Sequence, residues 1–118
     1  TIVAHVERLL SGGVLQVRDL AGKISLRELA AVLKKAKLFV GIDSGVMHMA
    51  SALDIPTVGI FGPTDPFYVA PQNARSMVVR KDMACSPCYL RGECEHRRCL
   101  QELGADAVVE ACRRVMGA

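Results

Sequence analysis

Residues 38–49 read LFVGIDSGVMHM, and their pattern predicts the class of fold. Its first five residues form a continuous apolar run of strand length, which is typical of a strand buried on both faces of a parallel sheet. Asp43-Ser44-Gly45 predicts a turn, and the Met- and Ala-rich residues from Val46 to Leu53 predict a short helix. A buried strand that leads through a tight turn into a helix indicates an α/β protein.

The same alternation continues on both sides of this stretch. Upstream, Ser25 and Glu28 form a capping box, which predicts the start of a helix with one apolar face. The other predicted elements are a helix over 2–10, a short strand over 14–17, strands over 57–61 and 77–79, an irregular loop over 62–66, and a closing helix over 105–116.

Alternating buried strands and helices predict the fold class α/β, with a partial doubly wound (Rossmann-like) sheet that is mostly parallel. The 118 residues suit a single domain, within which residues 80–100 form a Cys-rich loop segment. The chain starts at Thr1, inside a helical pattern, so we expect it to be a piece of a longer protein.

The composition restricts the classes of function. Hydrophobic residues make up 51% and charged residues 23%, a balance that belongs to a globular protein rather than a disordered one. The net charge of +3 does not by itself require nucleic acid or an acidic membrane as a partner. Only 4% of residues are aromatic, which argues against stacking on single-stranded bases. No apolar run approaches the roughly 18 residues of a membrane-spanning helix.

The first candidate site lies where the strand over 38–42 meets the next helix, because ligands of open α/β sheets bind beyond the carboxyl ends of the strands. The first amides of a helix, together with its dipole, attract an anion. Gly45 lets a phosphate approach the backbone, Ser44 caps the helix or donates its hydroxyl, and His48 aims an imidazole at the same anion.

Asp43 requires a different role, because a carboxylate repels phosphate. It accepts backbone amides, or it orients a sugar hydroxyl or His48. The alternative for the whole stretch is that Asp43 or Ser44 is only a helix cap and His48 is only a surface histidine.

The second candidate site is the loop Phe61-Gly62-Pro63-Thr64-Asp65-Pro66, which also follows a buried strand. We expect it to lie beside the first site at the edge of the sheet, where Thr64 and Asp65 can contact a ligand. The alternative is a rigid turn in which Thr64 or Asp65 satisfies local amides.

Four of the five cysteines cluster late in the chain and are candidate ligands of a structural zinc ion: Cys85, Cys88, Cys94 and Cys99. His96 can substitute for one of them. Their later spacings match no common zinc module, so free thiols, disulfides and an iron–sulfur cluster stay open. Cys112 lies on the apolar face of the closing helix, where we expect a core residue.

Basic residues surround these cysteines, namely Arg91, His96, Arg97 and Arg98. A zinc-knuckle-like binder of nucleic acid has a similar composition, and a basic loop can also face anionic lipid headgroups. We favour a solvated basic loop over the nucleic-acid binder, and contact with lipid headgroups stays open.

Three motifs in this order resemble glycosyltransferase family 9, the heptosyltransferases of lipopolysaccharide core synthesis. Residues 19–29, DLAGKISLREL, resemble a conserved stretch of that family, and Leu38 to Met49, with its Asp-Ser-Gly-x-x-His, resembles its strongest signature. Residues 61–66, FGPTDP, resemble the second signature. The Cys-x-x-Cys segment resembles one that many members carry.

This resemblance implies that the chain is part of the C-terminal, nucleotide-sugar-binding domain of a two-domain GT-B glycosyltransferase. The typical donor is ADP-L-glycero-D-manno-heptose. The residues that it implies for the site are Ser44, Gly45 and His48 on the diphosphate, Asp43 ordering the site or meeting the sugar, Ile24 against the adenine, and Thr64 and Asp65 on the sugar side. His48 and Asp43 are the catalytic candidates in this chain.

The resemblance also implies an inverting transfer of heptose to the inner core of lipopolysaccharide, with no metal required for catalysis. An N-terminal domain would hold the lipid A-core acceptor and supply the general base, in the cytoplasm and at the surface of the inner membrane. We therefore expect the chain alone to be inactive, and we expect an exposed sheet edge or apolar patch to favour a dimer. We expect no nucleic-acid partner.

Two other classes of function stay open from the sequence. One is a non-catalytic, Cys-rich zinc module that binds nucleic acid or a protein. The other is a different α/β domain that binds a sugar nucleotide, such as that of an epimerase.

Overall fold

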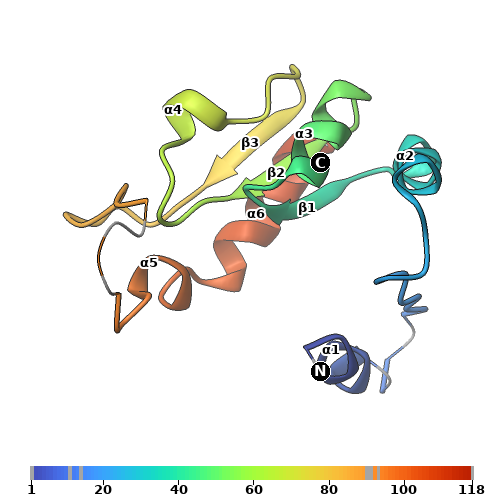
Figure 1. Cartoon of the computed structure of the whole chain (residues 1–118), viewed down its shortest axis with the longest axis horizontal. Helices are drawn as coiled ribbons and strands as arrows, with labels where there is room; N and C mark the ends of the chain where they lie inside the picture. The colour runs from blue at the N-terminus through green and yellow to red at the C-terminus, as the bar shows by residue number, and fades with distance from the viewer. Residues whose placement is uncertain (1, 11, 14, 90–91, 93, 118) are drawn as a thin grey trace.

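A computed structural model describes residues 2–10, 12–13, 15–89, 92 and 94–117. Three parallel strands form one sheet in the order β1-β2-β3 (Figure 1). The strands are β1 (Phe39–Ile42), β2 (Thr57–Ile60) and β3 (Ser76–Val79). The helices are α1 (Ile2–Leu10), α2 (Leu26–Lys35), α3 (Gly45–Ala52), α4 (Pro66–Val69), α5 (Arg98–Gln101) and α6 (Ala105–Val115).

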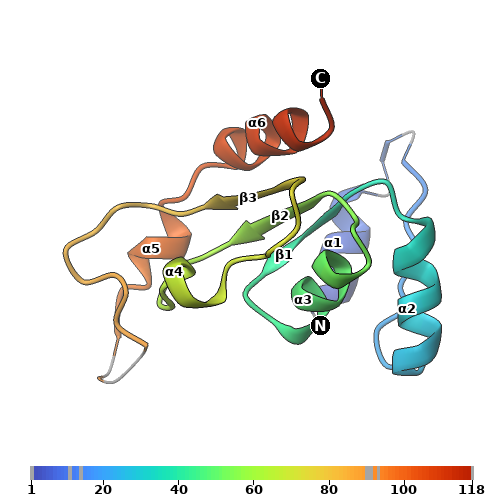
Figure 2. The same cartoon turned by 90° about the horizontal axis from the view of Figure 1, so that it is seen from above.

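Helices cover both faces of the sheet, which gives three layers (Figure 2). On one face, Leu33 of α2 and Ala50 of α3 form a buried cluster with Ile55. On the other face, Val58 of β2 and Val79 of β3 pack against Ala111 of α6. The predicted doubly wound α/β class is thereby confirmed.

Cys112 packs at the edge of the cluster under α6, as expected of a core residue. The capping box of α2 is also present. The Ser25 hydroxyl accepts a hydrogen bond from the Glu28 amide at 3.2 Å, and the Ser25 amide donates to the Glu28 carboxylate at 3.3 Å.

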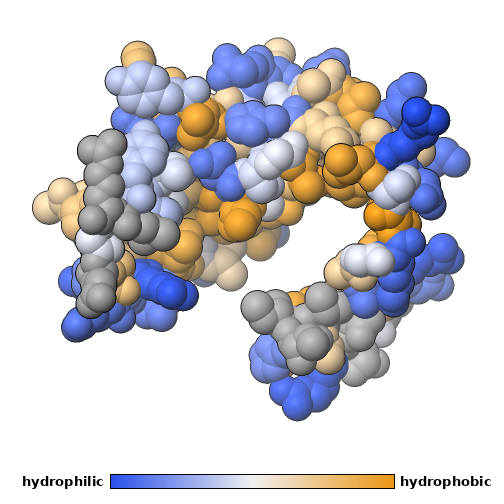
Figure 3. All heavy atoms as spheres, viewed as in Figure 1, coloured by the Kyte–Doolittle hydropathy of each residue, from blue (hydrophilic) through white to orange (hydrophobic). Residues whose placement is uncertain are grey.

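Strand β1 is buried on one face only, so the expectation of two buried faces is wrong for it. The side chains of Val40 and Ile42 are 43% and 62% exposed, whereas Thr57 and Val58 of β2 are fully buried. The register places Val40 beside Val58. Helix α6 packs on β2 and β3, and among the described residues no helix covers this face of β1 in a comparable way. Figure 3 shows hydrophobic side chains along the hollow beside the sheet.

The strand predicted over 14–17 is wrong for its described residues, 15–17, which are irregular. Leu15 and Val17 are 70% and 41% exposed. A strand of this length needs a hydrogen-bonding neighbour, and α1 together with this stretch lies apart from the sheet (Figure 1). Val14, the first residue of the predicted strand, lies outside the described residues.

Two short helices were not predicted. Pro66, expected to be irregular, begins α4 as a first-turn proline behind the N-cap Asp65. Helix α5 lies inside the Cys-rich segment. Both helices contain four residues, too few to show a helical period in the sequence.

Candidate functional site

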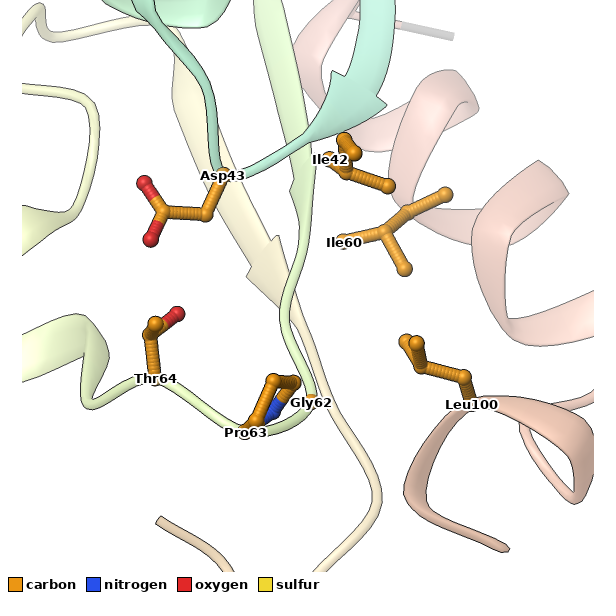
Figure 4. Close-up of a pocket in the computed structure, with 7 residues that line it drawn as sticks. All are labelled: Ile42, Asp43, Ile60, Gly62, Pro63, Thr64 and Leu100. Atoms are coloured by element: carbon orange, nitrogen blue, oxygen red, sulfur yellow. The ribbon is translucent and has the colours of Figure 1, made fainter. Parts of the chain in front are cut away.

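The predicted site residues that follow β1 and β2 meet at the carboxyl edge of the sheet. Asp43 and Thr64 line one pocket of about 150 Å³ there. Figure 4 shows their polar groups on one side of the pocket and the side chains of Ile42, Ile60 and Leu100 on the other. The pocket therefore offers a polar wall and an apolar wall to a ligand.

Helix α3 begins directly after Asp43, one of the residues that line this pocket. Ser44 is the N-cap, and its hydroxyl accepts a hydrogen bond from the Met47 amide at 3.4 Å. The amides of Gly45 and Val46 have no acceptor among the described residues. A Cβ placed on Gly45 would meet nothing within 4 Å, so the space beside the Gly45 backbone is open among the described residues. An anion can therefore approach the positive end of the helix.

His48 lies in the first turn of α3 and faces Asp43. Its Nε2 atom is 3.8 Å from Oδ1 of Asp43, which is the range of an ion pair rather than of a hydrogen bond. The His48 side chain is 46% exposed and that of Asp43 is 23% exposed. Asp43 is thus placed to orient His48, one of the roles expected for it, while the imidazole stays accessible to a ligand.

The Asp65 carboxylate has a local partner. Its Oδ1 atom accepts a hydrogen bond from the Phe67 amide at 2.9 Å, which caps α4. This is the rigid-turn alternative for Asp65. Thr64 differs, because its side chain lies at the pocket (Figure 4).

Ile24 lies in a separate pocket of about 370 Å³, between the loop at 20–22 and the first turn of α2. Sequence reasoning missed the apolar wall of the first pocket. Ile42 and Ile60 were assigned to strands and Leu100 to a loop. The position of both isoleucines at the last residue of a parallel strand was the available signal.

The four clustered cysteines are all free thiols. Among the residues that the structure describes, no three His, Cys, Asp or Glu side chains form a group that can hold a metal. The Sγ atom of Cys94 lies 4.0 Å from Nδ1 of His96 and accepts a hydrogen bond from the Arg97 amide at 3.4 Å. The described side chains therefore do not form a complete set of zinc ligands. Arg91, one of the basic residues near these cysteines, lies outside the described residues.

Glu102, which follows the Cys-rich segment, joins the two ends of that segment. Its carboxylate pairs with Arg98 and, at 2.7 Å, with Lys81. Hydrogen bonds from Arg98 and Lys81 lower the pKa of Glu102 from its usual 4.5 to about 2. The stabilisation from this carboxylate is therefore complete above pH 4.5 and is lost as the pH falls toward 2.

We accordingly expect Glu102→Gln to lower the urea midpoint of unfolding at neutral pH, by a small amount because these are surface ion pairs. The difference from the unsubstituted chain should shrink as the pH falls from 4.5 toward 2. Glu95→Gln, at an exposed position of the same segment, is the control and should show no such trend. A difference that stays constant over this pH range would contradict the ion-pair assignment.

No helix among the described residues is long and apolar enough to cross a membrane. The layers and the edge pocket define a doubly wound α/β domain, with its candidate site where such domains bind ligands. The chain belongs to glycosyltransferase family 9 (heptosyltransferase), whose family model matches residues 2–98. The resemblance seen in the three motifs is thus confirmed, and the match includes every candidate site residue except Cys99.

Individual heptosyltransferases are similar to this chain. Lipooligosaccharide heptosyltransferase 2 of Campylobacter jejuni is 30% identical over 115 residues, which cover 95% of this chain and 36% of that protein. Lipopolysaccharide heptosyltransferase 1 of Pseudomonas aeruginosa is 36% identical over 75 residues, which cover 64% of this chain and 21% of that protein.

A solved structure shares the fold. The structure of E. coli ADP-heptose lps heptosyltransferase II matches 84% of this chain and 27% of its own, with a TM-score of 0.69 and 29% sequence identity. The chain spans about a third of the length of the first of these curated relatives.

Proposed function

We propose that this chain is the donor-binding part of an inverting glycosyltransferase that transfers heptose from ADP-heptose to the inner core of lipopolysaccharide. The observation that carries the proposal is the open start of α3. There two amides without an acceptor among the described residues, the space over Gly45 and the accessible His48 lie next to the edge pocket. Family membership supports the reaction class.

The diphosphate of the donor binds at the α3 start in this proposal. Negative charge grows on the diphosphate as the bond to the sugar breaks. The amides of Gly45 and Val46, the Ser44 hydroxyl and the His48 imidazole stabilise that charge, which is electrostatic catalysis. Asp43 lies 3.8 Å from His48 and keeps the imidazole turned toward the site.

The pocket beside Asp43 takes the sugar. Its volume of about 150 Å³ is smaller than the roughly 300 Å³ or more of a pocket for a whole small-molecule ligand. The donor therefore extends out of it, across the α3 start. We assign Thr64 to the sugar, with Asp65 holding the loop. The apolar surface around Ile24 takes the adenine, in its own pocket.

Acceptor binding and general-base catalysis belong to a domain outside these 118 residues in this proposal. An acceptor domain holds the lipid A-core acceptor and supplies the general base, in the cytoplasm and at the surface of the inner membrane. The 118 residues act as one nucleotide-sugar-binding domain, which binds donor but does not transfer sugar alone. The exposed face of β1 at Val40 and Ile42 favours self-association of the isolated chain.

Zinc in the Cys-rich segment stays a structural proposal, because the described side chains form no complete ligand set. It has no part in the transfer step proposed here.

Calorimetric titration of the chain with ADP and with UDP tests this function. We expect saturable binding of ADP and at least about tenfold weaker binding of UDP, since a difference of about 1.4 kcal/mol in base contacts suffices for that ratio. Equal affinities would contradict the choice of ADP as the nucleotide. No binding of either nucleotide by the folded chain would contradict the donor-site assignment.

A further inference from the structure

The Cys-rich segment contacts residues 61–65, the loop between β2 and α4. Two side-chain hydrogen bonds join them, and each connects residues that are 24 positions apart in the sequence. The loop and the Cys-rich segment each contribute residues to the wall of the edge pocket. Gly62, Pro63 and Thr64 line it from the loop, and Leu100 lines it from α5 (Figure 4). The segment thus belongs to the surroundings of the candidate site.

Hydrogen bonds between the segment and the loop hold three loop residues, Gly62, Pro63 and Asp65. The Ser86 hydroxyl donates to the Gly62 carbonyl at 2.6 Å. The Pro63 carbonyl accepts from the amides of Cys88 and Tyr89, at 2.9 and 2.7 Å. The Asp65 amide donates to the Tyr89 hydroxyl at 3.2 Å. Thr64, the loop residue with its hydroxyl at the pocket, lies between these fixed points.

Polar contacts within the segment brace it, beginning directly after β3. Arg80 follows β3 directly, and its Nη2 atom donates to the carbonyl and the hydroxyl of Ser86, each at 3.3 Å. Lys81 and Arg98 both pair with Glu102. These contacts therefore connect Arg80, the residue that directly follows β3, through Ser86 to the loop that follows β2.

The loop and the segment also pack closely against each other. A Cβ placed on Gly62 would come within 2.9 Å of the Leu100 side chain and 3.0 Å of Sγ of Cys99. The backbone of the loop thus lies directly against α5, and glycine is the residue that permits this approach. A shift of the segment would move both the loop and the apolar wall of the pocket.

We propose that residues 80–100 are a positioning clamp for the 61–65 loop, with Ser86 and Tyr89 as the residues that fix Thr64 at the sugar pocket. The proposal rests on the proposed function, because the position of Thr64 matters to donor binding only if the pocket holds the donor sugar. It gives the Cys-rich segment a role in the site that requires no ligand of its own.

Tyr89→Phe tests the clamp, because it removes one hydroxyl from a side chain that is already 44% exposed. We expect the Asp65 amide to exchange with solvent about fivefold faster, as measured by NMR, since one neutral hydrogen bond is worth about that factor. We expect affinity for ADP-heptose to fall by about the same factor, with affinity for ADP unchanged. Tyr68→Phe is the matched control at a tyrosine 73% exposed, and should change none of these values.

Ser86→Ala supplies a second test, and Ser86→Thr, which keeps a hydroxyl, should restore ADP-heptose affinity. Unchanged Asp65 exchange in Tyr89→Phe, or equal losses of ADP and ADP-heptose affinity in both Tyr89→Phe and Ser86→Ala, would overturn the clamp. If the unsubstituted chain binds neither nucleotide, the proposed function fails. The Asp65 exchange rate then still decides whether Tyr89 holds the loop.

Discussion

Replacing His48 with alanine is expected to weaken ADP binding by about 10- to 100-fold, as measured by calorimetry. A hydrogen bond to a charged group contributes about 1.5–3 kcal/mol, which corresponds to that range. The imidazole is 46% exposed at the open start of α3, so its loss leaves the core intact. The melting temperature of the variant should therefore match that of the unsubstituted chain.

His5→Ala is the matched control for this experiment. His5 is exposed on α1, where its Nδ1 atom lies 2.8 Å from Arg8, and α1 lies apart from the sheet edge (Figure 1). We expect no change in ADP affinity for this variant. Equal losses in His48→Ala and His5→Ala would mean that the effect does not come from a site at α3.

The second large effect is expected for the core beside the site. Phe61→Ala should lower the free energy of unfolding by about 3–5 kcal/mol, the usual cost of removing a buried aromatic ring. Phe61 is 1% exposed, and Met47 of α3 is fully buried. The two side chains meet over Gly59, where an added Cβ would be 2.9 Å from each. Urea denaturation measures the loss.

Phe67→Ala provides the comparison, because Phe67 carries the same ring but is 84% exposed on α4. Its substitution should change the free energy of unfolding by no more than about 0.5 kcal/mol. Similar losses for the two phenylalanines would contradict the packing of Phe61 between the sheet and α3.

Residues 38–49 were predictable because their signals are local. The apolar run, the capping Ser44 and the helix-forming residues after it all indicate the same strand, turn and helix. The capping box of Ser25 and Glu28 was predictable for the same reason. Parallel strands that end at one edge then bring Asp43 and Thr64 together, as the site prediction required.

The features that were predicted wrongly or missed depend on contacts between distant parts of the chain. The exposure of Val40 and Ile42 is set by where α6 lies, and no pattern within β1 reports that. Leu15 and Val17 have strand-like composition but belong to no strand of the sheet. The bonds from Ser86 and Tyr89 to the loop span 24 residues, so the sequence alone gave no reason to connect the Cys-rich segment with the pocket.

The central claim is that a nucleoside diphosphate binds at the start of α3. The most direct measurement is an NMR titration of the isotope-labelled chain with ADP, following every backbone amide. We predict saturable shifts that are largest at Gly45 and Val46 and that need about 10- to 100-fold more ADP to reach saturation in His48→Ala. The largest shifts at residues away from the α3 start, or none at millimolar ADP in a folded sample, would contradict the claim.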